Sequence, residues 1–157
     1  MSYSARISWA RGPERFTDNR YSRAHRWYFD GGVEVPASSS PHSVPLPWSC
    51  AAAVDPEEAF VASLASCHML WFLSIAASRG YCVDSYDDEA EGVLAPNPAG
   101  KLAVTRVTLR PTALFSGEQR PTGPQIRELH EAAHAECYIA NSVSSEVRCE
   151  PRLRDDP

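Results

Sequence analysis

The sequence predicts an α+β fold in which antiparallel β-sheets surround a long buried central helix and a second helix. Stretches rich in β-forming residues lie before residue 39 and after residue 80. One long, uncharged helix separates these stretches, and a second helix precedes a short terminal strand. Groups of strands separated by single helices are typical of α+β domains.

The expected domain covers residues 1–157 and begins with strands within residues 2–38. The sequence "DGG" at 30–32 predicts a hairpin turn between two of these strands. Residues 39–54 are rich in serine and proline and predict a loop. A chain of this length has room for one domain with its own core.

The central helix is predicted over residues 56–79. Asp55 is a favourable N-cap, Pro56 suits the first helical position, and Glu58 completes a capping box. Gly80 supplies the expected stop, because glycine readily adopts the left-handed conformation that ends many helices.

Residues 59–78 of this helix carry no charged side chain, and their apolar residues point in all directions. A helix that is apolar all round is normally buried. Its length would also suit a membrane span, but serine, cysteine and histidine interrupt it. We therefore expect a core helix and no membrane.

The second half of the chain predicts a hairpin over residues 81–115, a second helix over 124–138 and a closing strand over 144–150. The hairpin turns at "PNPAG", and its return strand alternates apolar with polar residues. In the second helix, the apolar positions place Cys137 on the buried stripe.

Charge and cysteine usage limit the functional class. The net charge of −5 leaves no basic surplus for phosphates, so we expect no nucleic-acid partner. The sequence shows no secretory signal, and its five cysteines form no C-x-x-C pair. These features predict a cytoplasmic protein with mostly reduced thiols: Cys50, Cys67, Cys82, Cys137 and Cys149.

Residues 130–134, "HEAAH", match the zinc-peptidase signature, in which two histidines four residues apart bind zinc beside a catalytic glutamate. The longer form of that motif has glycine and a third histidine where this chain has Cys137 and Ala140. His130, His134 and Cys137 could still form a three-ligand site. A zinc hydrolase is therefore an alternative, while the main expectation is that the protein has no metal.

Cys67 in the central helix and Cys137 in the second helix offer another chemistry. Either one alone is typical of a small buried hydrophobe. Together they predict redox activity only if the helices bring them close, because one thiolate attacks and a second thiol resolves the product. An arginine from the basic stretch 11–26 could stabilise the thiolate, with Glu57 or Glu58 as its partner.

The segments that contain these cysteines resemble a known family. "DPEEAFVASLASC" (55–67) is similar to the first-cysteine segment of the OsmC/Ohr family, the osmotically inducible and organic-hydroperoxide-resistance proteins. "HEAAHAECYIANSV" (130–143) is similar to its second-cysteine segment. The order of expected elements also agrees over roughly residues 3–150.

This resemblance implies a thiol-dependent peroxidase that reduces organic hydroperoxides or hydrogen peroxide. Cys67 would be the peroxidatic cysteine and Cys137 the resolving cysteine. Glu57 matches the glutamate that pairs with the family's catalytic arginine, for which we favour Arg20, with Arg23 next. The implied partner is an external dithiol of the lipoyl or thioredoxin-like type, and no cofactor is implied.

The chain also departs from the family pattern. Tyr138 stands where better-known branches have proline, and His68 where they often have phenylalanine. His68 is expected mainly as a core or interface histidine, and Phe60 and Trp71 mainly as core residues. As the alternative, these three side chains could line a substrate pocket. The sequence does not identify the preferred peroxide or the reductant, and it assigns no role to three cysteines: Cys50, Cys82 and Cys149.

Helix geometry adds an expectation about assembly. Glu57 precedes Cys67 by ten residues, a rise of about 15 Å, so it cannot reach that thiol along its own helix. Either an arginine that bridges the two spans this gap, or the glutamate comes from a second subunit. Antiparallel packing of two central helices would bring each glutamate toward the other subunit's cysteine, which predicts an intertwined homodimer. A second class of function stays open, a non-catalytic dimer that binds a small apolar ligand.

Overall fold

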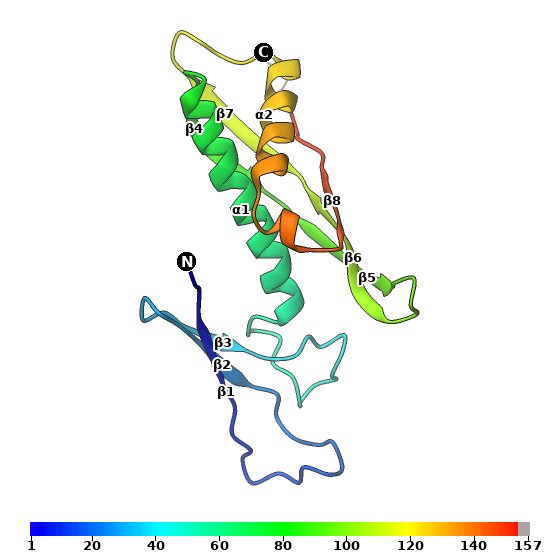
Figure 1. Ribbon diagram of the computed structural model, residues 1–157. Coiled ribbons are helices and arrows are strands. Elements are labelled where there is room, and N and C mark those ends of the chain that lie inside the picture. Colours follow the sequence, from blue (N-terminus) through cyan, green and yellow to red (C-terminus); the bar gives the residue numbers. More distant parts are fainter. Residues whose placement is uncertain (154–157) are drawn as a thin grey trace. The chain divides into compact units, whose positions relative to one another are not determined.

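The computed structural model describes residues 1–153, which form two compact units, Met1–Ala59 and a second unit that starts at Phe60 (Figure 1). The expectation of one domain stays a prediction. The elements otherwise follow the predicted order of strands, long helix, strands, helix and strand.

The first unit contains an antiparallel sheet in the order β1 (Ala5–Ser8), β2 (His25–Phe29) and β3 (Glu34–Ala37). The predicted turn joins β2 to β3, and Gly32 adopts a φ of 85°, which glycine accepts readily. The loop after β3 is fastened by a hydrogen bond from the Cys50 amide to the Ser38 hydroxyl (3.0 Å).

Helix α1 (Pro56–Ser78) begins and ends where the sequence predicts, to within one residue. The Asp55 amide donates to a Glu58 carboxylate oxygen (3.1 Å), and the Glu58 amide donates to Asp55 (2.8 Å), which completes the capping box. Gly80, with a φ of 82°, follows the helix and lets the chain turn away.

The second unit contains four strands where one hairpin was predicted, followed by β8. The strands are β4 (Cys82–Asp88), β5 (Glu91–Pro96), β6 (Leu102–Leu109), β7 (Pro111–Ser116) and β8 (Glu146–Cys149). β5 and β6 form the hairpin around "PNPAG", and β4 pairs antiparallel with β7. β8 pairs parallel with β6, because the chain returns through helix α2 (Gly123–Glu136).

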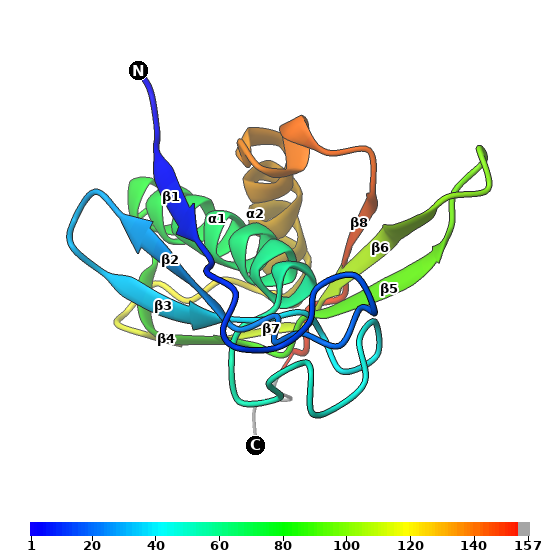
Figure 2. The ribbon, with the colours of Figure 1, turned by 90° about the horizontal axis from the view of Figure 1, so that it is seen from below.

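Both helices of the second unit pack on the same side of β4 and β7 (Figure 2). Phe72 and Ala76 of α1 meet Leu129 and Ala133 of α2 in one core cluster. A second cluster joins Leu64 of α1 to residues of β6.

The buried residues of α1 are Leu64, His68, Phe72 and Ala76, one stripe at four-residue spacing. The helix was predicted to be buried all round, but Leu70 on another face is 60% exposed. By length and composition α1 could cross a membrane, a test that core helices of soluble proteins also pass.

Candidate functional site

Cys67 lies beside the buried stripe of α1, on the helix face that lines a cavity of about 490 Å³. The side chain is half-buried. The cavity is lined mainly by one face of α1 and by the chain just after α2: Ser63, Ser66, Cys67, Leu70, Trp71, Ser74, Tyr138 and Ile139. This arrangement gives one cysteine an apolar surrounding and access from outside.

Cys137 is the C-cap of α2 and is 1% exposed. The predicted helix continued to residue 138, but α2 ends at Glu136 and the chain turns there. The Cys137 amide donates to the His134 carbonyl (3.3 Å), and the Ala140 amide donates to the Cys137 sulfur (3.4 Å). The second contact ties the thiol to the turn that follows α2.

The structure brings Cys67 and Cys137 together. Burial, followed by a hydrogen-bonding interaction with the Cys67 side chain, raises the pKa of the Cys137 thiol above its ordinary value. Cys137 therefore keeps its proton at neutral pH and is poorly suited to attack first. Cys67, which reaches the cavity, is the better candidate nucleophile.

The predicted pocket residues divide into two groups. Trp71 lines the cavity beside Cys67, and its ring meets that of Tyr138 edge-on at 5.5 Å. His68 faces the opposite way, into the core, and is 1% exposed. Phe60 packs against the cluster around Leu64.

The predicted arginine and glutamate lie in the first unit, whereas both cysteines lie in the second. The Arg20 guanidinium lies over the Trp48 ring, 5.9 Å from its centre. Arg23 hydrogen-bonds Asn19 (2.7 Å to Oδ1) and stacks on Tyr21 at 3.7 Å. Glu57 is half-buried in the first turn of α1.

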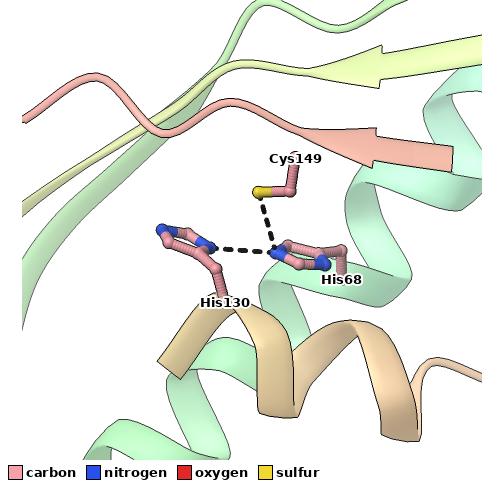
Figure 3. A group of neighbouring side chains, drawn as sticks. All are labelled: His68, His130 and Cys149. Atoms are coloured by element: carbon pink, nitrogen blue, oxygen red, sulfur yellow. Dashed lines mark hydrogen bonds between the residues drawn. The ribbon is translucent and has the colours of Figure 1, made fainter. Parts of the chain in front are cut away.

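A cluster that the sequence analysis did not identify lies on the core side of α1, where His68 meets His130 of α2 and Cys149 of β8 (Figure 3). Nε2 of His68 lies 3.0 Å from Nδ1 of His130 and 3.7 Å from the Cys149 sulfur. The ligand atoms all lie within 4.8 Å of one another. Helix periodicity places His130 at the edge of the buried stripe of α2, but it carries no signal that His68 and Cys149, from distant elements, meet it there.

Burial dominates the electrostatics of this cluster. It lowers the pKa of His68 to about 4, with a smaller effect of His134, and that of His130 to about 3, with a smaller effect of His68. It also raises the pKa of Cys149 to about 12, helped by Asp88 and Glu150. All three groups are therefore neutral at pH 7.

The two histidines of "HEAAH" have different surroundings. His130 is 3% exposed and joins the cluster, whereas His134 is exposed. Both line a cavity of about 320 Å³, together with Arg127, Glu131, Val147, Cys149 and Pro151. Within residues 1–153, the group suited to hold a metal contains His130 without His134 or Cys137.

Comparisons with known proteins agree with this architecture. An OsmC-like protein of unknown function from Vibrio cholerae has a structure with a TM-score of 0.95 and 56% sequence identity, covering 97% of this chain and 99% of that one. An organic hydroperoxide resistance protein from Legionella pneumophila shares the fold with a TM-score of 0.71 and 16% identity, covering 98% of each chain. Another from Bacillus subtilis has a TM-score of 0.63 and 20% identity, covering 96% of this chain and 98% of that one.

A comparison with curated protein sequences finds no match. The sequence pattern of the family described as OsmC-like protein, however, matches residues 50–152, which include α1, both helix cysteines and every element of the second unit. The chain therefore belongs to the OsmC family.

Proposed function

We propose that the protein is a thiol-dependent peroxidase that reduces organic hydroperoxides. The observation that carries this proposal is the proximity of the Cys67 and Cys137 side chains beside an apolar cavity. A peroxidatic cysteine needs access to substrate, and a resolving cysteine needs access to the first cysteine. Cys67 lines the cavity, and Cys137 is buried and close to the Cys67 side chain.

The reaction follows from these positions. The Cys67 thiolate attacks the outer oxygen of the hydroperoxide, the O–O bond breaks, and the alkoxide takes a proton and leaves as an alcohol. The resulting Cys67 sulfenic acid then reacts with Cys137, which gives a disulfide and releases water. An external dithiol of lipoyl or thioredoxin-like type reduces this disulfide by exchange and is itself oxidised.

The cavity favours an organic substrate over hydrogen peroxide. Leu70, Trp71 and Ile139 supply apolar surface beside Cys67. Burying an alkyl or aryl group there releases water from both surfaces, at roughly 25 cal/mol per Å². Hydrogen peroxide has no such group to bury.

Arg20 is proposed as the cation that stabilises the thiolate, and Glu57 as the residue that orients it. The Arg20 guanidinium makes no hydrogen bond or ion pair among residues 1–153 beyond its position over Trp48. Arg23 instead binds its own loop through Asn19 and Tyr21. Arg20 is thus the freer of the two to approach a thiolate.

The proposed assembly is a homodimer formed through the uncovered face of α1. Residues 59–78 carry no charge, and Leu70 is largely exposed on that face. A second copy would cover this face and bring Glu57 toward the opposite Cys67. We propose on the same grounds that α1 is an interface helix in a soluble, cytoplasmic protein.

A turnover assay tests the proposed activity. We expect the protein to consume an alkyl hydroperoxide when supplied with a dithiol such as dihydrolipoamide, and Cys67→Ser to be inactive. Cys50→Ser, which changes an exposed cysteine, is the matched control and should retain activity. Failure to consume any peroxide would instead favour a module that binds an apolar ligand in the same cavity.

A further inference from the structure

We infer that His68, His130 and Cys149 form a zinc-binding site on the core side of α1. The inference departs from the expectation of no metal, and it does not depend on the proposed peroxidase activity. Three elements far apart in the sequence, α1, α2 and β8, each supply one ligand (Figure 3). Imidazole and thiolate are the ligands that Zn²⁺ prefers in proteins.

The ligand spacing suits a tetrahedral ion. With Zn–N bonds of about 2.0–2.1 Å and a Zn–S bond of about 2.3 Å, two nitrogens lie about 3.3 Å apart, and nitrogen and sulfur about 3.6 Å apart. The two nitrogens of His68 and His130 are separated by 3.0 Å, and His68 Nε2 and the Cys149 sulfur by 3.7 Å. All three ligand atoms lie within 4.8 Å of one another, so zinc binding would draw His130 and Cys149 closer together by up to about 1 Å.

Three residues at or near the cluster carry unsatisfied polar atoms, and in His68 this atom is Nδ1, on the other side of the ring from the Nε2 that faces His130. Within residues 1–153, four buried side-chain atoms have no hydrogen-bond partner, and three belong to His68, Tyr86 and Asp88. Tyr86 and Asp88 also interact electrostatically with Cys149. Buried polar atoms without partners are rare and commonly mark an absent water or ion.

The charges balance when the metal binds. The hydrogen bond between His68 Nε2 and His130 Nδ1 places a proton on one of these two nitrogens. When zinc binds, this proton moves to the other nitrogen of the same ring, so that each neutral imidazole offers a lone pair to the metal. The Cys149 thiol exchanges its proton for Zn²⁺, and the proton goes to solvent. The remaining single positive charge of the zinc–thiolate unit is then offset by the nearby Asp88 carboxylate.

The fourth coordination position has room for water. His130 and Cys149 line the 320 Å³ cavity, whose other residues include His134, Glu131 and Arg127. Three protein ligands with an open fourth position are typical of catalytic zinc sites, whereas structural sites are closed. The cavity beside Cys67 shares none of these lining residues, so the two sites are separate.

Metal titration of the full chain tests the inference. After removal of metal by a chelator, the protein should bind one Zn²⁺ per chain. Co²⁺ in its place should give a thiolate-to-cobalt charge-transfer band. Cys149→Ser should abolish this band and weaken zinc binding at least about 100-fold, since loss of an outer-shell partner alone costs 10–100-fold. Cys82→Ser, at an exposed cysteine, is the matched control and should behave as wild type.

Two results would overturn the inference. One is no stoichiometric Zn²⁺ or Co²⁺ binding by wild-type protein. The other is a cobalt band that persists in Cys149→Ser and disappears in Cys67→Ser or Cys137→Ser, which would place the metal on the cysteine pair. X-ray absorption of zinc-loaded wild type, expected to show two nitrogens and one sulfur, keeps the test valid if a variant does not fold. Oxidation of Cys67 by peroxide can be measured in the same Cys149→Ser variant. This measurement tests the proposed peroxidase activity independently of zinc binding.

Discussion

Cys67 and Cys137, seventy residues apart in the sequence, interact through their side chains where α1 passes the end of α2. The pair joins an accessible thiol that lines a cavity to a buried thiol whose pKa is raised. In the proposed cycle, this difference favours Cys67 for the first attack and Cys137 for the resolving step.

Replacement of Arg20 by methionine should slow oxidation of Cys67 by an alkyl hydroperoxide about 100-fold. The reason is that the thiolate would lose its stabilising cation, and removal of one preorganised donor costs about 10²–10³ in rate. The measurement is stopped-flow oxidation of the reduced protein. Arg26→Met is the matched control, because Arg26 pairs with Glu34 on the surface of the first unit. A larger loss in Arg23→Met than in Arg20→Met would transfer the role to Arg23.

Replacement of Leu70 by aspartate should convert the dimer into monomers, because a charge would enter an apolar interface. Sedimentation velocity at micromolar concentration measures this. Leu102→Asp is the matched control, because Leu102 is also exposed (70%, against 60% for Leu70) but lies on β6. A wild-type protein that is monomeric at this concentration would contradict the proposed assembly.

Replacement of Trp71 by leucine should raise the KM for an aromatic hydroperoxide about tenfold and change that for hydrogen peroxide little. Trp71 offers apolar surface that only the organic substrate can use, and small changes in such pockets are worth about 1–3 kcal/mol. Steady-state assays of wild type and variant measure the KM for each of the two peroxides. Trp9→Leu in the first unit is the control. Equal changes for both substrates would exclude Trp71 from substrate selection.

Asp88 should give the metal-free protein a pH-dependent loss of stability. Burial raises its pKa, aided by Asp87 and opposed by the Arg110 amide and by the charges of Arg110 and Arg152. The folded state then binds the proton more tightly than the unfolded state. Its stabilising contribution is present below the unfolded pKa of about 3.8 and is lost as the pH rises through the folded value.

Comparing the stability of Asp88→Asn with that of the wild type isolates this effect. In the wild type the Arg110 amide donates to Asp88 Oδ1 (2.6 Å), and the side-chain oxygen of asparagine can still accept this hydrogen bond. The free energy of unfolding of Asp88→Asn relative to wild type should increase as the pH rises from 3.5 to 7. Urea denaturation at several pH values measures it. A constant difference across this range would show that Asp88 has the same pKa in both states.

Local sequence signals predicted much of the fold. The Asp55–Glu58 capping box and Gly80 fix the ends of α1, and the apolar spacing of α2 places Cys137 inside. These features depend on near neighbours in the chain. The parallel pairing of β8 with β6 was missed, because it depends on the path of the chain through α2.

The same distinction between local signals and long-range contacts applies to the two candidate sites. The meeting of Cys67 and Cys137 was expected from a resemblance covering both segments, whereas helix periodicity alone gave only their burial. The cluster of His68, His130 and Cys149 joins three distant elements, and a single sequence carries no signal that they converge. His68 was expected mainly in the core or an interface, with the substrate pocket as the alternative. Successive helical residues point about 100° apart, so His68 faces the core while Cys67 lines the cavity.

Non-reducing mass spectrometry after one equivalent of an alkyl hydroperoxide tests the central claim most directly. We expect a disulfide between Cys67 and Cys137 in the wild type. It should be absent from Cys67→Ser and replaced by a Cys67 sulfenic acid in Cys137→Ser. Thiols that remain reduced in the folded wild type, or a disulfide that excludes Cys67, would contradict the proposed peroxidase cycle.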